Sequence, residues 1–201
     1  MSTAHDSADP NNVKLLRFLP YVYLLILSSS LLGNVYQACR LRIQSNTRSP
    51  AQTHLIEKQV GQKLLSFNVM TLAGKKEKLP FAGPSNTIVY IFDPHCYWCA
   101  RNLPNLLSLV SQRESTYHFV GISRTSHDLQ DYLSVHPLPF PVYVDSSEED
   151  FKRLDFLGTP QTLIVLPDGT VKHNWPGAYD GSTRQALQEY LQVDLPGLLP
   201  S

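Results

Sequence analysis

Two cysteines separated by two aromatic residues, Cys96-Tyr97-Trp98-Cys99, lie between a predicted strand and a predicted helix. The preceding run, residues 87–92, consists of β-branched and aromatic side chains, which is typical of a buried strand. Leucine and valine then recur at 103, 106, 107 and 110, the spacing of an apolar helix face. We therefore expect Cys96 at the N-terminus of a helix, where unpaired backbone N–H groups and the helix dipole favour a thiolate. Cys99 follows one turn later, near enough to form a disulfide with Cys96.

The composition limits what such a chain can do. Lys+Arg and Asp+Glu number 17 each, so the formal net charge is zero and the sequence offers no basic surface for nucleic acid. Three cysteines are too few for a disulfide-stapled scaffold, and an odd number cannot pair completely within one chain. The length of 201 residues fits one domain with extensions. We assign no role to the third cysteine, Cys39.

An apolar segment near the N-terminus, residues 18–38, carries no charged side chain. A helix of about 20 residues at roughly 1.5 Å each spans the hydrocarbon core of a bilayer. One alternative is a cleaved signal peptide with Ser28-Ser29-Ser30 as its small-residue site, and another is a lipoprotein cysteine at Cys39. The apolar stretch continues past the serines, and Tyr36-Gln37-Ala38 suits neither processing site. We predict a retained transmembrane anchor at 15–38, with membrane contact through 18–38.

The orientation of this anchor is inferred from function rather than from charge. Basic residues precede the segment at Lys14 and Arg17 and follow it at Arg40, Arg42 and Arg48, which leans weakly toward a cytoplasmic domain. An anchored C-x-x-C domain, however, usually works in an oxidising compartment. We therefore expect a single-pass membrane protein whose soluble domain faces the periplasm or the extracytoplasmic side, with a bacterial inner membrane as the expected location.

The rest of the chain divides into a folded domain and polar flanks. We predict a disordered tail at 1–14, a flexible linker at 39–59, the folded domain at 60–193 and a C-terminal tail at 194–201. Within the domain, apolar β-type runs predict strands at 67–72, 87–92, 117–122, 140–144, 162–166 and 170–173. Helices are expected after Cys96, from Ser126, over 147–157, and from Ser182 with a capping box. This alternation predicts an α/β fold whose mixed sheet is flanked by helices and ends in an antiparallel hairpin.

Two further motifs accompany the cysteine pair. Pro104 lies within the predicted helix, where a missing backbone donor causes a kink. Gly158-Thr159-Pro160 precedes an apolar strand. In this order the motifs resemble those of the thioredoxin-like superfamily, in particular its membrane-anchored TlpA-like redoxins and the thioreductases of cytochrome c maturation, over residues 60–193. The resemblance implies a thioredoxin-like fold with an N-terminal β-hairpin extension, preceded by one transmembrane helix, and a cis bond before Pro160 that faces the cysteines.

These motifs assign roles to five residues of the predicted site. Cys96 is expected to be the exposed nucleophile, and Cys99 to resolve the mixed disulfide that Cys96 forms. By resemblance, Thr159 and Pro160 would pair with an extended substrate peptide. Trp98 is expected to contribute to an apolar docking surface beside the cysteines, the alternative being that it only covers the start of the helix.

Two residues beside the cysteines are candidates for tuning pKa values. Protonated His95 would lower the pKa of Cys96 and make the couple more oxidising, the alternative being an exposed loop histidine. Asp93 is a candidate proton acceptor, the alternative being a turn-forming Asp-Pro. The carboxylates that many relatives use for proton transfer are replaced here by Tyr90 and Asn102, so the resemblance leaves the direction of electron transfer open.

We therefore predict a membrane-anchored thiol–disulfide oxidoreductase acting on protein thiols and disulfides, with reduction favoured over oxidation by family branch. We expect no cofactor and no metal, because the cysteines and His95 lack a second set of ligands. A membrane or periplasmic redox partner would recycle the cysteines. The alternative is a non-catalytic binding or chaperone module with a structural cysteine pair. A peroxide-reducing redoxin is disfavoured, because the pattern Pro-x-x-x-Thr-x-x-Cys is absent.

Overall fold

The structure is a computed structural model that describes residues 23–31, 33–37, 59–64, 68–79, 81, 83–145 and 158–200. The chain divides into two compact units, Met1–Thr47 and Arg48–Ser201. The predicted tail at 1–14, nearly all of the predicted linker at 39–59, Cys39 and the predicted helix over 147–157 lie outside the described residues.

The first unit contains helical residues 23–31 and 33–37. Large apolar side chains of this segment, such as Tyr23 at 68% and Leu31 at 70%, are exposed. Across the part of the chain that the structure describes, no helix combines the length and apolarity needed to cross a bilayer. The predicted anchor at 15–38 therefore stays a prediction.

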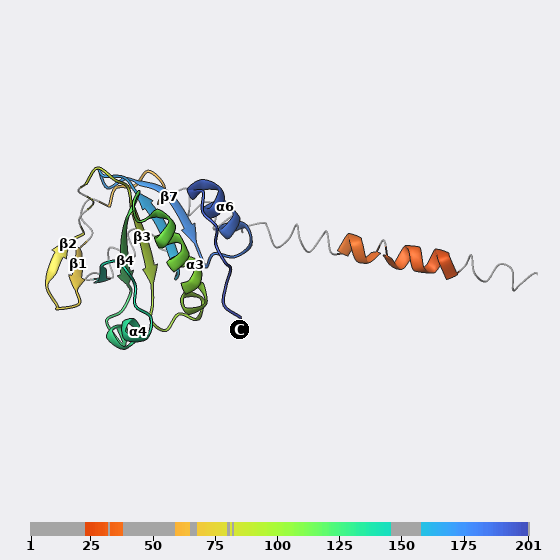
Figure 1. The fold of residues 1–201 in the computed structure, drawn as a ribbon, viewed down its shortest axis with the longest axis horizontal. Coiled ribbons are helices and arrows are strands. Elements are labelled where there is room, and N and C mark those ends of the chain that lie inside the picture. The colour runs from red at the N-terminus through yellow and green to blue at the C-terminus, as the bar shows by residue number, and fades with distance from the viewer. Residues whose placement is uncertain are drawn as a thin grey trace, which may run out of the picture. The chain divides into compact units, whose positions relative to one another are not determined.

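The second unit is built on a seven-stranded sheet with the order β2-β1-β5-β4-β3-β6-β7 (Figure 1). Its strands are β1 (Asn68–Thr71), β2 (Lys76–Lys78), β3 (Thr87–Phe92), β4 (His118–Ser123), β5 (Val142–Asp145), β6 (Gln161–Val165) and β7 (Val171–Pro176). β3 pairs in parallel with β4, and β4 with β5, whereas the other neighbouring pairs are antiparallel. The predicted mixed sheet, its N-terminal hairpin and its antiparallel last hairpin are confirmed.

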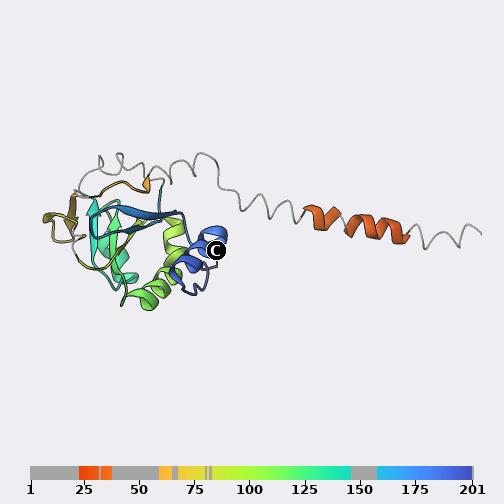
Figure 2. The same ribbon diagram turned by 90° about the horizontal axis from the view of Figure 1, so that it is seen from above.

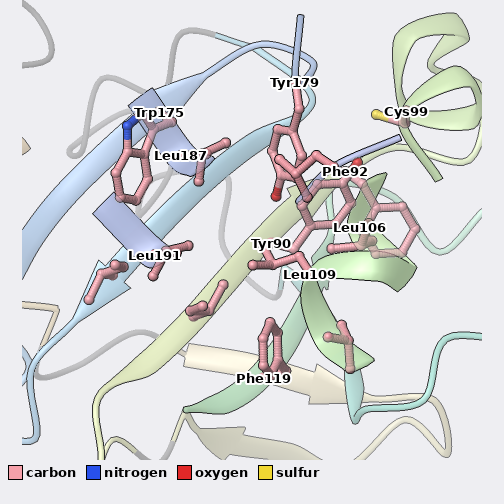
Figure 3. Close-up of a cluster of buried hydrophobic side chains, with 14 of the residues drawn as sticks. Tyr90, Phe92, Cys99, Leu106, Leu109, Phe119, Trp175, Tyr179, Leu187 and Leu191 are labelled. Carbon is pink, nitrogen blue, oxygen red and sulfur yellow. The ribbon is translucent and has the colours of Figure 1, made fainter. Parts of the chain in front are cut away.

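Three helices are described in this unit: α3 (Tyr97–Arg113), α4 (Leu129–Val135) and α6 (Gly181–Leu191). Figures 1 and 2 show α3 crossing the sheet on the side where α6 lies. Every residue of β3 is buried. Successive side chains of the strand point to opposite faces of the sheet, and each face carries its own apolar cluster. Ile88, Tyr90 and Phe92 pack with the helices, as Figure 3 shows for the latter two, whereas Val89 and Ile91 pack on the opposite face.

The buried face of α3 differs from the predicted one. Leu106 and Val110 are buried as expected, but Leu107 is 37% exposed. The remaining buried positions are Cys99, Asn102, Asn105 and Leu109. The predicted buried face is displaced around the helix from the observed one, because a hydropathy pattern assigns asparagine to the solvent side. Here the two asparagine side chains can be buried because their amides make internal hydrogen bonds.

Two helix starts also differ from their predictions. α4 begins after Asp128, which adopts a left-handed backbone (φ 55°), rather than at a Ser126 cap. α6 begins two residues earlier than the predicted Ser182 cap, because the Asp180 side chain accepts a hydrogen bond from the N–H of Gly181 at 2.9 Å. In both cases an aspartate nearby in the chain took the N-terminal position that a serine was expected to hold.

The chain after α6 runs back along α3 and forms what we call the C-terminal strap (residues 194–199). The N–H of Asp194 donates to Gln112, and the N–H of Gly197 donates to the buried Asn105 at 2.7 Å. Leu199 exchanges hydrogen bonds with Arg101, one turn from the start of α3. The strap is therefore antiparallel to α3 and ends close to the cysteine pair, where Figure 1 marks the C-terminus.

Candidate functional site

Cys96 occupies the N-cap position of α3, with an extended backbone (φ −76°, ψ 111°). β3 ends at Phe92, and the turn that follows is closed by a hydrogen bond from the N–H of Cys96 to the carbonyl of Asp93 at 3.0 Å. The sulfur of Cys96 accepts a hydrogen bond from the N–H of Cys99 at 3.2 Å. The predicted placement of Cys96 at a helix N-terminus is confirmed.

The two thiols of this site differ in burial and in acidity. Cys96 is half-buried, whereas Cys99 is 1% exposed, and both are free thiols. Hydrogen bonds from the Cys99 side chain, from Thr159 and from the backbone N–H groups of Cys99 and Trp98 lower the pKa of Cys96 to about 6, against the opposing effect of burial. Burial, followed by the neighbouring Cys96, raises the pKa of Cys99 far above its ordinary value. At neutral pH the accessible sulfur is thus a thiolate and the inaccessible one a thiol.

The loop before β6 faces the cysteines. The Thr159–Pro160 peptide bond is cis, as the resemblance implies. The carbonyl of Thr159 accepts a hydrogen bond from Cys96 Sγ at 3.3 Å, and the carbonyl of Pro160 accepts one from the N–H of Gly177 at 2.8 Å. The fold therefore brings together four of the predicted site residues, Cys96, Cys99, Thr159 and Pro160. They come from two segments, and Cys96 and Thr159, which are in contact, are 63 residues apart in the sequence.

Neutral polar side chains fill the space behind Cys99. Tyr90 is 2% exposed, and its hydroxyl accepts a hydrogen bond from the amide of Asn102 at 3.5 Å. The Asn102 oxygen accepts from the N–H of Tyr179 at 2.9 Å and from Asn105 at 3.1 Å. Burial, with Cys99 as the next cause, holds the pKa of Tyr90 well above its ordinary value. Neither Tyr90 nor Asn102 can accept a proton at neutral pH, so this network positions α3 without acting as a base.

Exposed aromatic side chains lie on the solvent side of the cysteines. Tyr97 and Trp98 are 55% and 47% exposed, and their rings meet edge to face at 5.3 Å. The guanidinium of Arg101 lies 5.5 Å from the centre of the Tyr97 ring and 5.3 Å from that of Trp98. Arg101 is fixed in turn by the carbonyl of Leu199, at 2.7 Å from its Nε. The geometry suits a docking surface that the C-terminal strap holds in shape.

His95 and Asp93 lie at the rim of the site. The N–H of His95 donates to Asp93 Oδ1 at 2.8 Å, the local pattern of an Asx turn. The ring Nε2 of His95 is 3.0 Å from Asp128 Oδ2, and this hydrogen bond is the main cause that raises the pKa of His95. Asp128 was not identified from the sequence, because it lies 33 residues away from His95 on the loop before α4.

Comparisons with known proteins agree with this architecture. A model of the AhpC/TSA family matches residues 60–174. Sporulation thiol-disulfide oxidoreductase A of Bacillus subtilis (strain 168) is 22% identical over 132 residues, which cover 63% of this chain and 78% of that protein.

Two solved structures resemble the chain in fold. A protein of Chlorobium tepidum described as a thiol:disulfide interchange protein DsbE aligns with a TM-score of 0.56 and 18% identity, over 66% of this chain and 96% of that one. A secreted disulfide oxidoreductase of Mycobacterium tuberculosis aligns with a TM-score of 0.51 and 22% identity, over 64% and 96%. These alignments confirm the predicted thioredoxin-like α/β fold.

Proposed function

This chain belongs to the AhpC/TSA family, and from that premise we propose that it is a thiol–disulfide oxidoreductase which exchanges disulfides with protein substrates through Cys96 and Cys99. One observation carries the proposal, the division of labour between the two thiols. A reactive dithiol needs one accessible thiolate to attack and one protected thiol to resolve. Cys96, with a pKa of about 6, and Cys99, which is 1% exposed, meet these two needs.

The reductive direction proceeds in two balanced steps. The Cys96 thiolate attacks one sulfur of a substrate disulfide, which forms a Cys96–substrate disulfide and releases the other substrate sulfur as a thiolate. Cys99 then loses its proton and attacks the Cys96 sulfur, which releases the second substrate thiolate and leaves a Cys96–Cys99 disulfide. Two electrons pass to the substrate, and the reverse sequence oxidises it. We favour reduction, with a membrane or periplasmic partner that later reduces the Cys96–Cys99 disulfide.

The fate of the Cys99 proton follows from the neutral network behind it. Tyr90 and Asn102 are both buried and uncharged, so neither takes this proton. The leaving substrate thiolate, formed beside the cysteines in the first step, is the base at hand. At a fixed pKa of the second substrate thiol, which is the leaving group of this step, resolution should therefore be faster when the first-released thiol has a higher pKa, because its thiolate is the stronger base.

Substrate binding uses the surfaces on both sides of Cys96. Only the protonated thiol of Cys96 can donate to the Thr159 carbonyl. In the thiolate and in the mixed disulfide this donor is gone, so the carbonyl is free to pair with an extended substrate backbone. The exposed rings of Tyr97 and Trp98 supply apolar contact for the flanking residues of the substrate.

We place this domain outside the cytoplasm of a bacterium, held at the inner membrane through residues 18–38. The support is the absence of charge over those residues together with the chemistry of the site. A periplasm-dependent reporter fused after Ser201 should be active. Activity of a cytoplasm-dependent reporter at the same position would contradict the placement.

Disulfide turnover by the purified full-length chain tests the proposed function. Cys96→Ser should abolish turnover, because no nucleophile remains. Cys99→Ser should halt after the first step and accumulate a covalent protein–substrate disulfide at Cys96, visible on non-reducing gels. If both variants match the parent chain, the alternative of a non-catalytic module with a structural cysteine pair is correct.

A further inference from the structure

We propose that His95, His127 and Asp128 bind a divalent transition-metal ion, of which Zn²⁺ and Cu²⁺ are the probes used below. One ligand atom from each residue can be chosen so that all three lie within 4.8 Å of one another. Asp128 Oδ2 is 3.0 Å from His95 Nε2 and 2.9 Å from His127 Nδ1. Two imidazole nitrogens thus lie within 3.0 Å of the same carboxylate oxygen, so ligand atoms of the types that such an ion prefers are gathered in one place.

The fold brings these three side chains together from two loops. His95 follows β3, and His127 and Asp128 follow β4, the parallel neighbour of β3. The two loops leave adjacent strand ends, where Phe92 is in register with Ser123, and the N–H of Arg124 donates to the carbonyl of Phe92 at 2.9 Å. Both loops therefore begin at adjacent strands near the middle of the sheet.

A second carboxylate orients the first histidine. Asp93 Oδ1 accepts from the backbone N–H of His95 at 2.8 Å and lies 3.4 Å from the ring Nδ1 of the same residue. With Nδ1 facing Asp93, the Nε2 atom of His95 is the ring nitrogen that would exchange its hydrogen bond with Asp128 for the ion. Carboxylates placed behind a histidine in this way fix the tautomer and raise the basicity of metal-binding imidazoles.

Charge and ligand type select the class of ion. Asp93 and Asp128 supply two negative charges beside two imidazoles that are neutral when they bind a metal. Imidazole ligands favour Zn²⁺, Cu²⁺ and Ni²⁺, whereas Mg²⁺ and Ca²⁺ favour all-oxygen sites. The side chains of His95, His127 and Asp128 are 55%, 75% and 53% exposed, so the remaining coordination positions are open to water.

Metal binding at this site would be a function separate from disulfide exchange by Cys96 and Cys99. His95 immediately precedes Cys96 in the chain, so one proposed ligand is the sequence neighbour of the nucleophile of the disulfide exchange. Binding would replace the contacts that the two histidines make with Asp128. This inference does not rest on the proposed function, because the ligands are not the redox-active sulfurs.

The test is metal binding by the full-length chain without a histidine tag, in which Cys39, Cys96 and Cys99 are all replaced by serine. Removing the thiols excludes thiolate binding and makes the outcome independent of disulfide exchange. We expect one Zn²⁺ per chain by calorimetry, and a Cu²⁺ electron paramagnetic resonance spectrum with coupling from imidazole nitrogen. His127→Ala should weaken binding by about tenfold or more, since losing an outer-shell partner alone costs this much.

The control for this test is a histidine variant outside the proposed site. His118 is an exposed histidine outside the cluster, so His118→Ala should bind Zn²⁺ as the cysteine-free parent does. His127 is the most exposed of the three ligands, and circular dichroism should show its alanine variant folded. Binding that is absent in the parent, or that His118→Ala weakens as much as His127→Ala, overturns the proposal. Asp128→Asn provides a second check and should also weaken binding.

Discussion

Replacing Asn105 by alanine should destabilise the protein by about 2–4 kcal/mol. The buried amide of Asn105 donates to Asn102 Oδ1 at 3.1 Å and to the Tyr179 carbonyl at 3.2 Å, and its oxygen accepts from the N–H of Gly197 at 2.7 Å. Asn102 Oδ1 still accepts from the N–H of Tyr179. The two backbone groups that lose their partner are therefore the carbonyl of Tyr179 and the N–H of Gly197. Each buried group left without a partner costs about 1–3 kcal/mol, and water can reach the half-buried Gly197, which favours the lower part of the combined range.

Urea unfolding followed by tryptophan fluorescence measures this loss. With a slope of about 2 kcal/mol per molar urea, the unfolding midpoint should fall by about 1–2 M. The control is Ser108→Ala, one turn further along α3, because Ser108 also contacts the strap through the carbonyl of Asp194 at 3.0 Å but is more exposed. It should cost no more than about 1 kcal/mol. An Asn105→Ala midpoint within error of the Ser108→Ala midpoint would refute the role of the buried amide in holding the strap.

Three further predictions concern the site itself. Cys99→Ala removes the hydrogen bond that most lowers the pKa of Cys96, so this pKa should move from about 6 toward 9.0, as measured by the pH dependence of thiolate absorbance. The free energy of unfolding of the reduced protein should increase as the pH rises from about 6 to 9.0, because over this interval the unfolded chain still binds the Cys96 proton and the folded chain does not. Cys96→Ser should not show this increase. An equal increase in the variant would contradict the lowered pKa of Cys96. Trp98→Ala should raise the KM for a protein disulfide several-fold while leaving a small-molecule disulfide nearly unaffected, because only the larger substrate reaches the exposed ring; equal effects on both substrates would exclude docking.

Much of the fold could be predicted because its signals are local. The uniformly apolar run of β3 followed by the Asp-Pro turn places Cys96 at a helix start without any long-range information. The hairpin of β1 and β2 likewise follows from alternating residues that end in a glycine turn. Pro160 was identified as cis through the resemblance, since no local propensity distinguishes it from an ordinary turn proline.

What the sequence concealed depends on contacts between distant segments. Asn102 and Asn105 look like solvent-facing helix residues, and only the return of the strap and of Tyr179 shows why they are buried. The partnership of His95 with Asp128 arises because two parallel strands end side by side, a fact that no spacing along the chain reveals. Arg101 gains its position from Leu199 in the same way, so its contacts with the rings of Tyr97 and Trp98 could not be predicted from residues 96–99 alone.

The reactivity of Cys96 as a function of pH distinguishes an accessible thiolate from an ordinary thiol. The reduced full-length protein is alkylated for short times between pH 4 and 10, and the modified cysteine is identified by mass spectrometry after proteolysis. Alkylation at Cys96 should rise with a midpoint near pH 6, the pKa of its thiol, while Cys99 stays unmodified throughout. A midpoint near the ordinary value of 9.0, or alkylation of Cys99 as fast as that of Cys96, would contradict the assignment of Cys96 as the accessible thiolate and Cys99 as the protected thiol.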